Sequence, residues 1–211
     1  MFALSSPQMQ SGFLPLATAL IAIGLIRMIG GSGRGATLAG FGLALGALVS
    51  YWAIFRFPAF PPAGATNKLF YILLAATTAG FAADLMRSQA WIGRIVSVAA
   101  GPLAVLWIGG SKALESPWPD GAALALVALV SAAAGARLPA QRARSNEPAT
   151  LVFVLSFALA VCAFLTNAAA SAQLVIGLGA ATGGFLLWNW PRSRFAFGAS
   201  ALRRLCLAWR C

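Results

Sequence analysis

Residues 12–55 have the sequence GFLPLATALIAIGLIRMIGGSGRGATLAGFGLALGALVSYWAIF, in which two long apolar runs flank a short glycine-rich segment. Each run approaches the length of about 20 residues that an α-helix needs to cross the hydrocarbon core of a bilayer. Residues 30–35, GGSGRG, lie between them. Glycine ends helices and supplies the backbone conformations of tight turns. We therefore interpret this stretch as a helical hairpin that crosses a membrane twice.

A phosphate-binding loop is the functional alternative for residues 30–35. Such a loop follows a β-strand and opens a helix whose N–H groups point at the anion. Here the glycines follow an apolar run of helical length, and the Lys-Ser/Thr pair of a P-loop is missing. The acidic residue that a dinucleotide site needs about 20 positions later is also missing. The sequence therefore favours a turn, which we expect on the cytoplasmic side.

The composition of the whole chain is that of a membrane protein. Hydrophobic residues make up 60% of the 211 residues, charged residues 9%, and the mean hydropathy is +0.84. A soluble domain usually has roughly 25% charged residues to cover its surface with water. The net charge of +11 comes from residues at the ends of apolar segments. That placement is typical of charges that orient membrane spans, and it argues against a nucleic-acid-binding patch.

Seven segments are long and apolar enough to be read as spans, and they predict an all-α integral membrane protein. The fold class is a bundle of about seven transmembrane helices, which we place in residues 1–190. The fifth segment is the shortest, but Trp118 and Arg137 on its two sides could anchor it at the interfaces. The predicted spans are residues 12–29, 36–55, 69–86, 91–108, 121–136, 149–165 and 170–190.

The distribution of positive charge predicts the orientation of these spans. With the N-terminus outside and the C-terminus in the cytoplasm, only Arg56, Lys68 and Lys112 fall in outer segments, and the other twelve basic residues face the cytoplasm. Removing the span 121–136 would place the arginine-rich C-terminal tail outside, which the positive-inside rule disfavours. Because arginine far outnumbers lysine and alanine is abundant, we expect a bacterial inner (plasma) membrane.

Charge inside the membrane is nearly absent, and its one acidic example is shallow. Asp84 lies near the cytoplasmic end of its span, with Arg87 three residues later and Arg94 at the start of the next span. A proton relay is conceivable, but an interfacial ion pair of Asp84 with Arg87 and Arg94 is the simpler interpretation. The lack of a charge at mid-membrane argues against ion-coupled transport.

Small and polar residues within the spans favour close packing of helices, and a solute pathway is the alternative. Gly42 and Gly46, and again Gly179 and Gly183, form GxxxG pairs that let helices approach closely. Pro102 is expected to kink its helix. A cavity for a neutral or apolar solute would be lined by hydroxyls near this proline. Its candidate residues are Thr77, Thr78, Ser97 and Pro102.

The C-terminal segment 191–211 forms a separate, basic tail. On a helix its apolar side chains share one face, with arginines around them, and this pattern suits contact with the anionic cytoplasmic leaflet. A docking handle for a partner is the alternative. The residues expected at the membrane surface are Arg203, Arg204, Trp209 and Arg210.

The absence of histidine restricts the chemistry available to this chain. It removes imidazole ligation of haem, histidine-based zinc sites and histidine-dependent triads. We expect no enzyme activity, cofactor, metal or nucleic acid. Two hypotheses are left: an accessory or anchoring subunit that packs against other membrane subunits, and a small carrier for a neutral or apolar solute.

Overall fold

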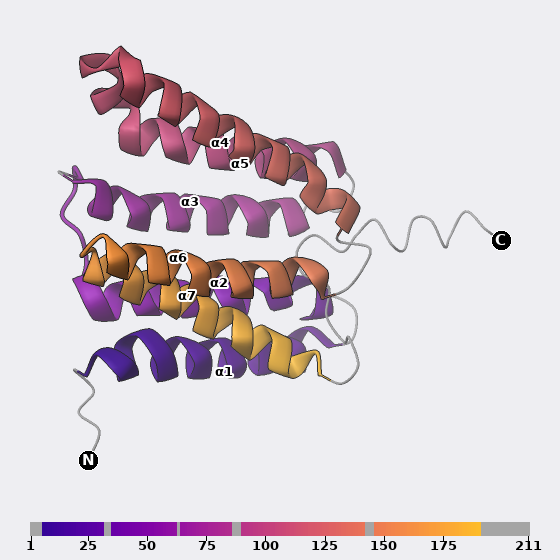
Figure 1. Cartoon of the computed structure of the whole chain (residues 1–211). Coiled ribbons are helices and arrows are strands. Elements are labelled where there is room, and N and C mark those ends of the chain that lie inside the picture. The colour runs from indigo at the N-terminus through magenta and orange to yellow at the C-terminus, as the bar shows by residue number, and fades with distance from the viewer. Residues whose placement is uncertain (1–5, 32–34, 63, 86–89, 142–145, 191–211) are drawn as a thin grey trace. The chain divides into compact units, whose positions relative to one another are not determined.

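The computed structural model describes residues 6–31, 35–62, 64–85, 90–141 and 146–190 (Figure 1). Apart from short turns and the loop that follows residue 55, these ranges are helical, with no β-strand among them. Two π-helical turns, η1 (Met9–Phe13) and η3 (Pro117–Gly121), precede α1 and α5 respectively. The α-helices are α1 (Leu14–Gly30), α2 (Ala36–Phe55), α3 (Ala65–Leu85), α4 (Ala90–Glu115), α5 (Ala122–Gln141), α6 (Glu147–Leu165) and α7 (Ala169–Trp188).

Each predicted span coincides with one α-helix, although the bounds differ where a helix continues into polar sequence. α3 begins at Ala65 rather than at residue 69, α4 continues to Glu115, and α5 continues to Gln141. The apolar run is shorter than the helix in these three cases, because the backbone hydrogen bonds of a helix continue past the last apolar side chain.

Within the described residues, three helical segments are long and apolar enough to cross a membrane, as expected of a membrane protein. They are Met9–Gly30, Leu38–Phe55 and Ala169–Trp188. The segments Ile95–Ser111, Trp118–Ala134 and Ala149–Leu165 are shorter apolar helices. Crossing by all seven helices and the orientation of the termini stay predictions.

The chain divides into two compact units, which we describe separately. The described part of unit 1 contains η1, α1, α2, α6 and α7. Its apolar core takes one buried residue from each of the four α-helices: Ile23, Ala39, Ala149 and Phe185. α7 packs against α1, α2 and α6, so it is the central helix of unit 1.

Glycines set the close approach of helices in unit 1. A Cβ added at Gly46 would lie 2.8 Å from the Pro15 carbonyl oxygen and 2.9 Å from the Ala181 Cβ. A Cβ added at Gly42 would lie 2.6 Å from the Ile23 Cγ1. The pair Gly179 and Gly183 faces the phenylalanines of α6, with hypothetical contacts of 3.2–3.3 Å. The packing interpretation of both GxxxG pairs is confirmed.

The glycine-rich segment joins two helices that pack against each other. α1 ends at Gly30, Gly31 has a φ of +61°, and α2 begins at Ala36. A Cβ at Gly35 would lie 2.7 Å from the Ile26 carbonyl oxygen, so the returning chain needs a glycine there. Residues 32–34 lie outside the described part. The hairpin interpretation of residues 12–55 agrees with this geometry.

Unit 2 consists, in its described part, of α3, α4, η3 and α5. α4 packs against both α3 and α5. Its contact with α5 is tight, because a Cβ at Gly101 would lie 2.9 Å from the Ser131 Cβ and one at Gly109 would collide with Leu124. α4 runs through Pro102 and continues to Glu115.

Candidate functional site

The predicted interfacial ion pair falls outside what the structure describes. Asp84 and Arg94 belong to the backbone of α3 and α4, but their side chains are not among the described ones, and Arg87 lies between the described ranges. The same holds for the tail, since Arg203, Arg204, Trp209 and Arg210 lie beyond residue 190. Both assignments stay predictions.

The predicted solute pathway lies on α3 and α4, which pack against each other within unit 2. Its threonine hydroxyls donate to their own helix: Thr77 Oγ1 to the Leu73 carbonyl at 2.6 Å, and Thr78 Oγ1 to the Ala75 carbonyl at 3.0 Å. A hydroxyl that bonds to the preceding turn satisfies its donor without any solute. Ser97 and Pro102 lie on α4.

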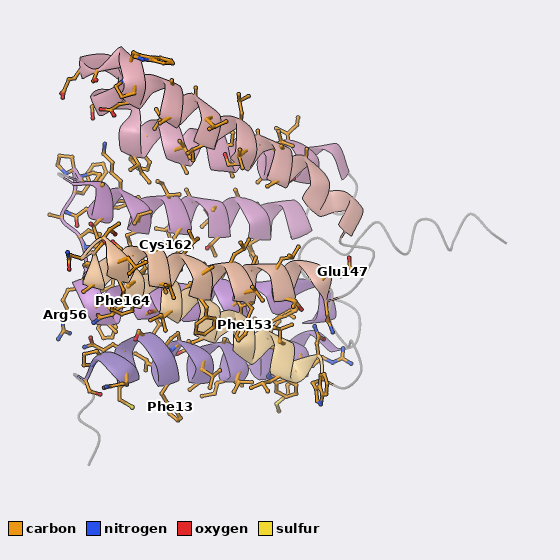
Figure 2. The ribbon with its side chains drawn as sticks, in the orientation of Figure 1. Phe13, Arg56, Glu147, Phe153, Cys162 and Phe164 are labelled. Atoms are coloured by element: carbon orange, nitrogen blue, oxygen red, sulfur yellow. The ribbon has the colours of Figure 1, made fainter. Side chains whose placement is uncertain are left out.

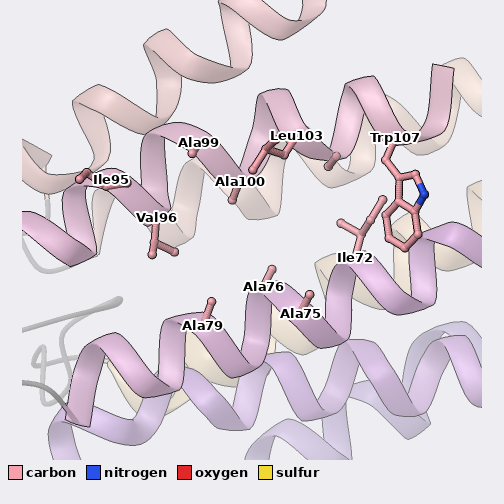
Figure 3. Close-up of a pocket in the computed structure, with 11 residues that line it drawn as sticks. Ile72, Ala75, Ala76, Ala79, Ile95, Val96, Ala99, Ala100, Leu103 and Trp107 are labelled. Atoms are coloured by element: carbon pink, nitrogen blue, oxygen red, sulfur yellow. The ribbon is translucent and has the colours of Figure 1, made fainter. Parts of the chain in front are cut away.

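An apolar groove runs between α3 and α4, with a cavity volume of about 330 Å³ (Figure 3). Alanines on both helices give it room, because a methyl side chain leaves the space that a leucine would fill. Most of the larger side chains that line the groove belong to α4. The lining residues are Ile72, Ala75, Ala76, Ala79, Ile95, Val96, Ala99, Ala100, Leu103, Ala104 and Trp107.

The predicted pathway residues are neighbours of this groove but do not line it. Thr77 and Thr78 follow Ala75 and Ala76 directly in α3, and Ser97 and Pro102 alternate with lining residues of α4. The groove lies between the two helices that carry the predicted pathway residues, but its lining is apolar and does not include their hydroxyls. The sequence signal of this lining is the set of alanines in 75–79 and 99–104, several of them three or four residues apart.

One end of the groove carries a positive charge. The Lys68 Nζ donates a hydrogen bond of 2.9 Å to the backbone carbonyl of Trp107, and this bond joins the start of α3 to α4. Next to it, the Tyr71 hydroxyl donates to the Pro58 carbonyl at 3.1 Å, and its ring meets Phe60 edge-on, with ring centroids 5.7 Å apart. The preceding loop is thus tied to α3 at the charged end.

Polar side chains in unit 1 serve contacts between helices. The Trp188 Nε1 of α7 donates to the Leu20 carbonyl of α1 at 3.0 Å, and the indole lies against Gly24. The buried Ser50 Oγ of α2 donates to the Gln10 carbonyl of η1 at 3.4 Å. Such bonds fix the register of helices that are apolar nearly all round.

The described ranges contain no group of three or more His, Cys, Asp or Glu residues placed to hold a metal ion. Cys162, the one cysteine within these ranges, is exposed on α6 (Figure 2).

The described part of the chain is therefore all-helical, and it contains helices that are long and apolar enough to span a membrane. No protein-family model, curated protein or solved structure matches the chain.

Proposed function

We propose that this protein is a non-catalytic, multi-pass protein of a bacterial inner membrane that serves as an accessory or anchoring subunit of a larger assembly. In this proposal residues 1–190 form seven spans, with the N-terminus outside, and residues 191–211 lie on the cytoplasmic leaflet.

The observation that carries the proposal is the exposed apolar face of α6. The side chains of Leu151, Leu155 and Leu159 follow one another at helical spacing and are 50%, 56% and 58% exposed. The opposite side, with Ala149 and Ala160, is buried. A face of this kind suits lipid or a helix of another subunit.

The arrangement of hydroxyls also favours a packing role over a solute site. Ser131, Ser156 and Thr182 each donate to a carbonyl of their own helix, at 2.7–2.8 Å. Hydroxyls used in this way do not form a polar cavity for a substrate.

The experiment that tests this proposal is the native mass and composition of the tagged protein, extracted in mild detergent from its own cells. Subunits that copurify in fixed stoichiometry support the accessory function. A monomer or homo-oligomer alone would overturn it. The α6 variant Leu155→Ala tests whether the exposed face of α6 is the contact surface. We expect it to lower the amount of the copurifying subunits while the protein itself accumulates.

The alternative function is a carrier for a neutral or apolar solute, and the groove between α3 and α4 favours it. Asp84→Asn separates the two hypotheses. An accessory subunit should lose expression or assembly, with no effect on a specific flux. A carrier should accumulate normally and lose or alter uptake.

A further inference from the structure

We propose that the groove between α3 and α4 binds one acyl chain of an anionic phospholipid, whose headgroup is held at the end marked by Lys68 and Trp107. This binding requires only that unit 2 lies in a bilayer, so it holds for an accessory subunit and for a carrier alike.

The lining of the groove fits an acyl chain. All eleven lining residues have hydrocarbon side chains except Trp107, whose indole is largely apolar. Ile95 and Trp107 are twelve residues apart, which is about 18 Å along a helix. One leaflet of the hydrocarbon core, half of about 30 Å, has a similar depth. A volume of about 330 Å³ also lies at the lower end of the range for ligand pockets.

The open side of the groove gives a chain access from the lipid phase. Ile95 and Leu103 line the groove and are 55% and 64% exposed. The alanines opposite them, such as Ala76, have no side-chain atoms that could fill the gap (Figure 3). The side chains of α3 and α4 do not fill the gap between them. In a bilayer a lipid chain would fill it, because an empty space forfeits dispersion contacts.

The charged end of the groove fits an anionic headgroup. Lys68 precedes Ile72 by one helical turn, so it lies on the face of α3 that lines the groove. Its ammonium has three N–H donors, and the Trp107 carbonyl takes one. The others can bind phosphate oxygens. Trp107 lies at the same end, and tryptophan is enriched at the depth of lipid headgroups.

Photocrosslinking of the full-length protein tests the proposal directly. The purified protein is placed in phosphatidylcholine vesicles containing a trace of phosphatidylglycerol with a diazirine in its acyl chain. We expect labelling of peptides containing residues 72–79 and 95–107 about fivefold above that of the exposed α6 peptide, since one Lys near a headgroup is worth about that factor. Equal labelling of α6 would overturn the proposal.

A second arm tests the headgroup. The same diazirine on phosphatidylcholine should label the groove several-fold less than the phosphatidylglycerol probe does, and Lys68→Gln should remove the difference. Equal labelling by the two lipids in the wild-type protein would overturn the assignment of an anionic lipid.

Filling the groove tests the position of the chain. Ala76→Leu places a larger side chain in the groove, and Ala125→Leu makes the same change at an exposed position of α5. We expect only Ala76→Leu to lose the labelling, at unchanged helicity by circular dichroism. Retained labelling in a folded Ala76→Leu protein would contradict the proposal. If this variant does not fold, the wild-type labelling pattern and Lys68→Gln still decide.

Discussion

Gly46 lies where α2 meets both α1 and α7, and its missing side chain sets the distance between them. The atoms that a new methyl group would meet are a backbone carbonyl oxygen and an alanine Cβ, at 2.8 and 2.9 Å. Neither can rotate away as a long side chain would. The close contact is therefore a property of the backbones themselves.

Gly46→Ala should destabilise the protein although alanine is the better helix former. Overpacking of this kind costs about 1–3 kcal/mol, which exceeds the gain of about 1 kcal/mol in helix propensity. Gly80→Ala in α3 is the matched control, since no atom beyond its chain neighbours and the adjacent turns of its own helix lies within 4 Å of its hypothetical Cβ. Thermal unfolding in detergent should show a lower midpoint for Gly46→Ala and an equal or higher one for Gly80→Ala. A Gly46→Ala midpoint at or above the wild-type value would contradict the packing.

Trp188→Phe should weaken the contact between α7 and α1. The substitution keeps an aromatic ring against Gly24 but removes the N–H that the Leu20 carbonyl accepts. Hydrogen bonds between membrane helices average about 0.6 kcal/mol, so we expect a small loss of stability, measured in the same unfolding assay. Trp190→Phe, at a side chain that is 79% exposed, should have no effect. Equal effects of the two variants would argue against the bond.

Among the elements, the sequence predicted the α-helices of the described ranges, but of their pairings only the hairpin of α1 and α2. Apolar runs ending in glycine, proline or charge define helix positions, as at Gly30 and near Pro58. Helices such as α6 and α7 are apolar nearly all round, so no polar face shows which neighbour each one takes. The groove between α3 and α4 depends on that pairing, so the sequence placed candidate residues on both helices without indicating the alanine lining.

The α6 helix provides a test of crossing, because its apolar segment Ala149–Leu165 is short. Leu155→Arg places a charge near the middle of this segment, on the exposed side. If α6 spans the bilayer, the apparent free energy of insertion should rise by about 3–4 kcal/mol, because an unfavourable Arg replaces a favourable Leu. Asn167→Arg, at the turn between α6 and α7, should leave insertion unchanged. A glycosylation-based insertion assay measures both, and normal insertion of Leu155→Arg would show that α6 does not cross.

At the scale of the whole molecule, two kinds of sequence information bear on topology. Apolar length identifies where a chain can cross, and the arginines between the apolar segments identify which ends stay in the cytoplasm. In the part of the chain that the structure describes, three helices meet the length and composition required for crossing on their own. Crossing by the other four helices depends on the charge pattern and on neighbouring helices, so the complete seven-span topology needs a direct test.

Cysteine accessibility in intact cells tests the seven-span topology. Single cysteines are introduced into a variant in which Cys162, Cys206 and Cys211 are serine, and a membrane-impermeant maleimide is added before and after permeabilisation. Seven spans predict labelling from outside at Ser6, Ala59, Ser116 and Asn167. They predict labelling only after permeabilisation at Ser32, Ser88, Ser145 and Ser193. Labelling of Ser116 and Ser145 from the same side would contradict the account, because α5 would then not cross.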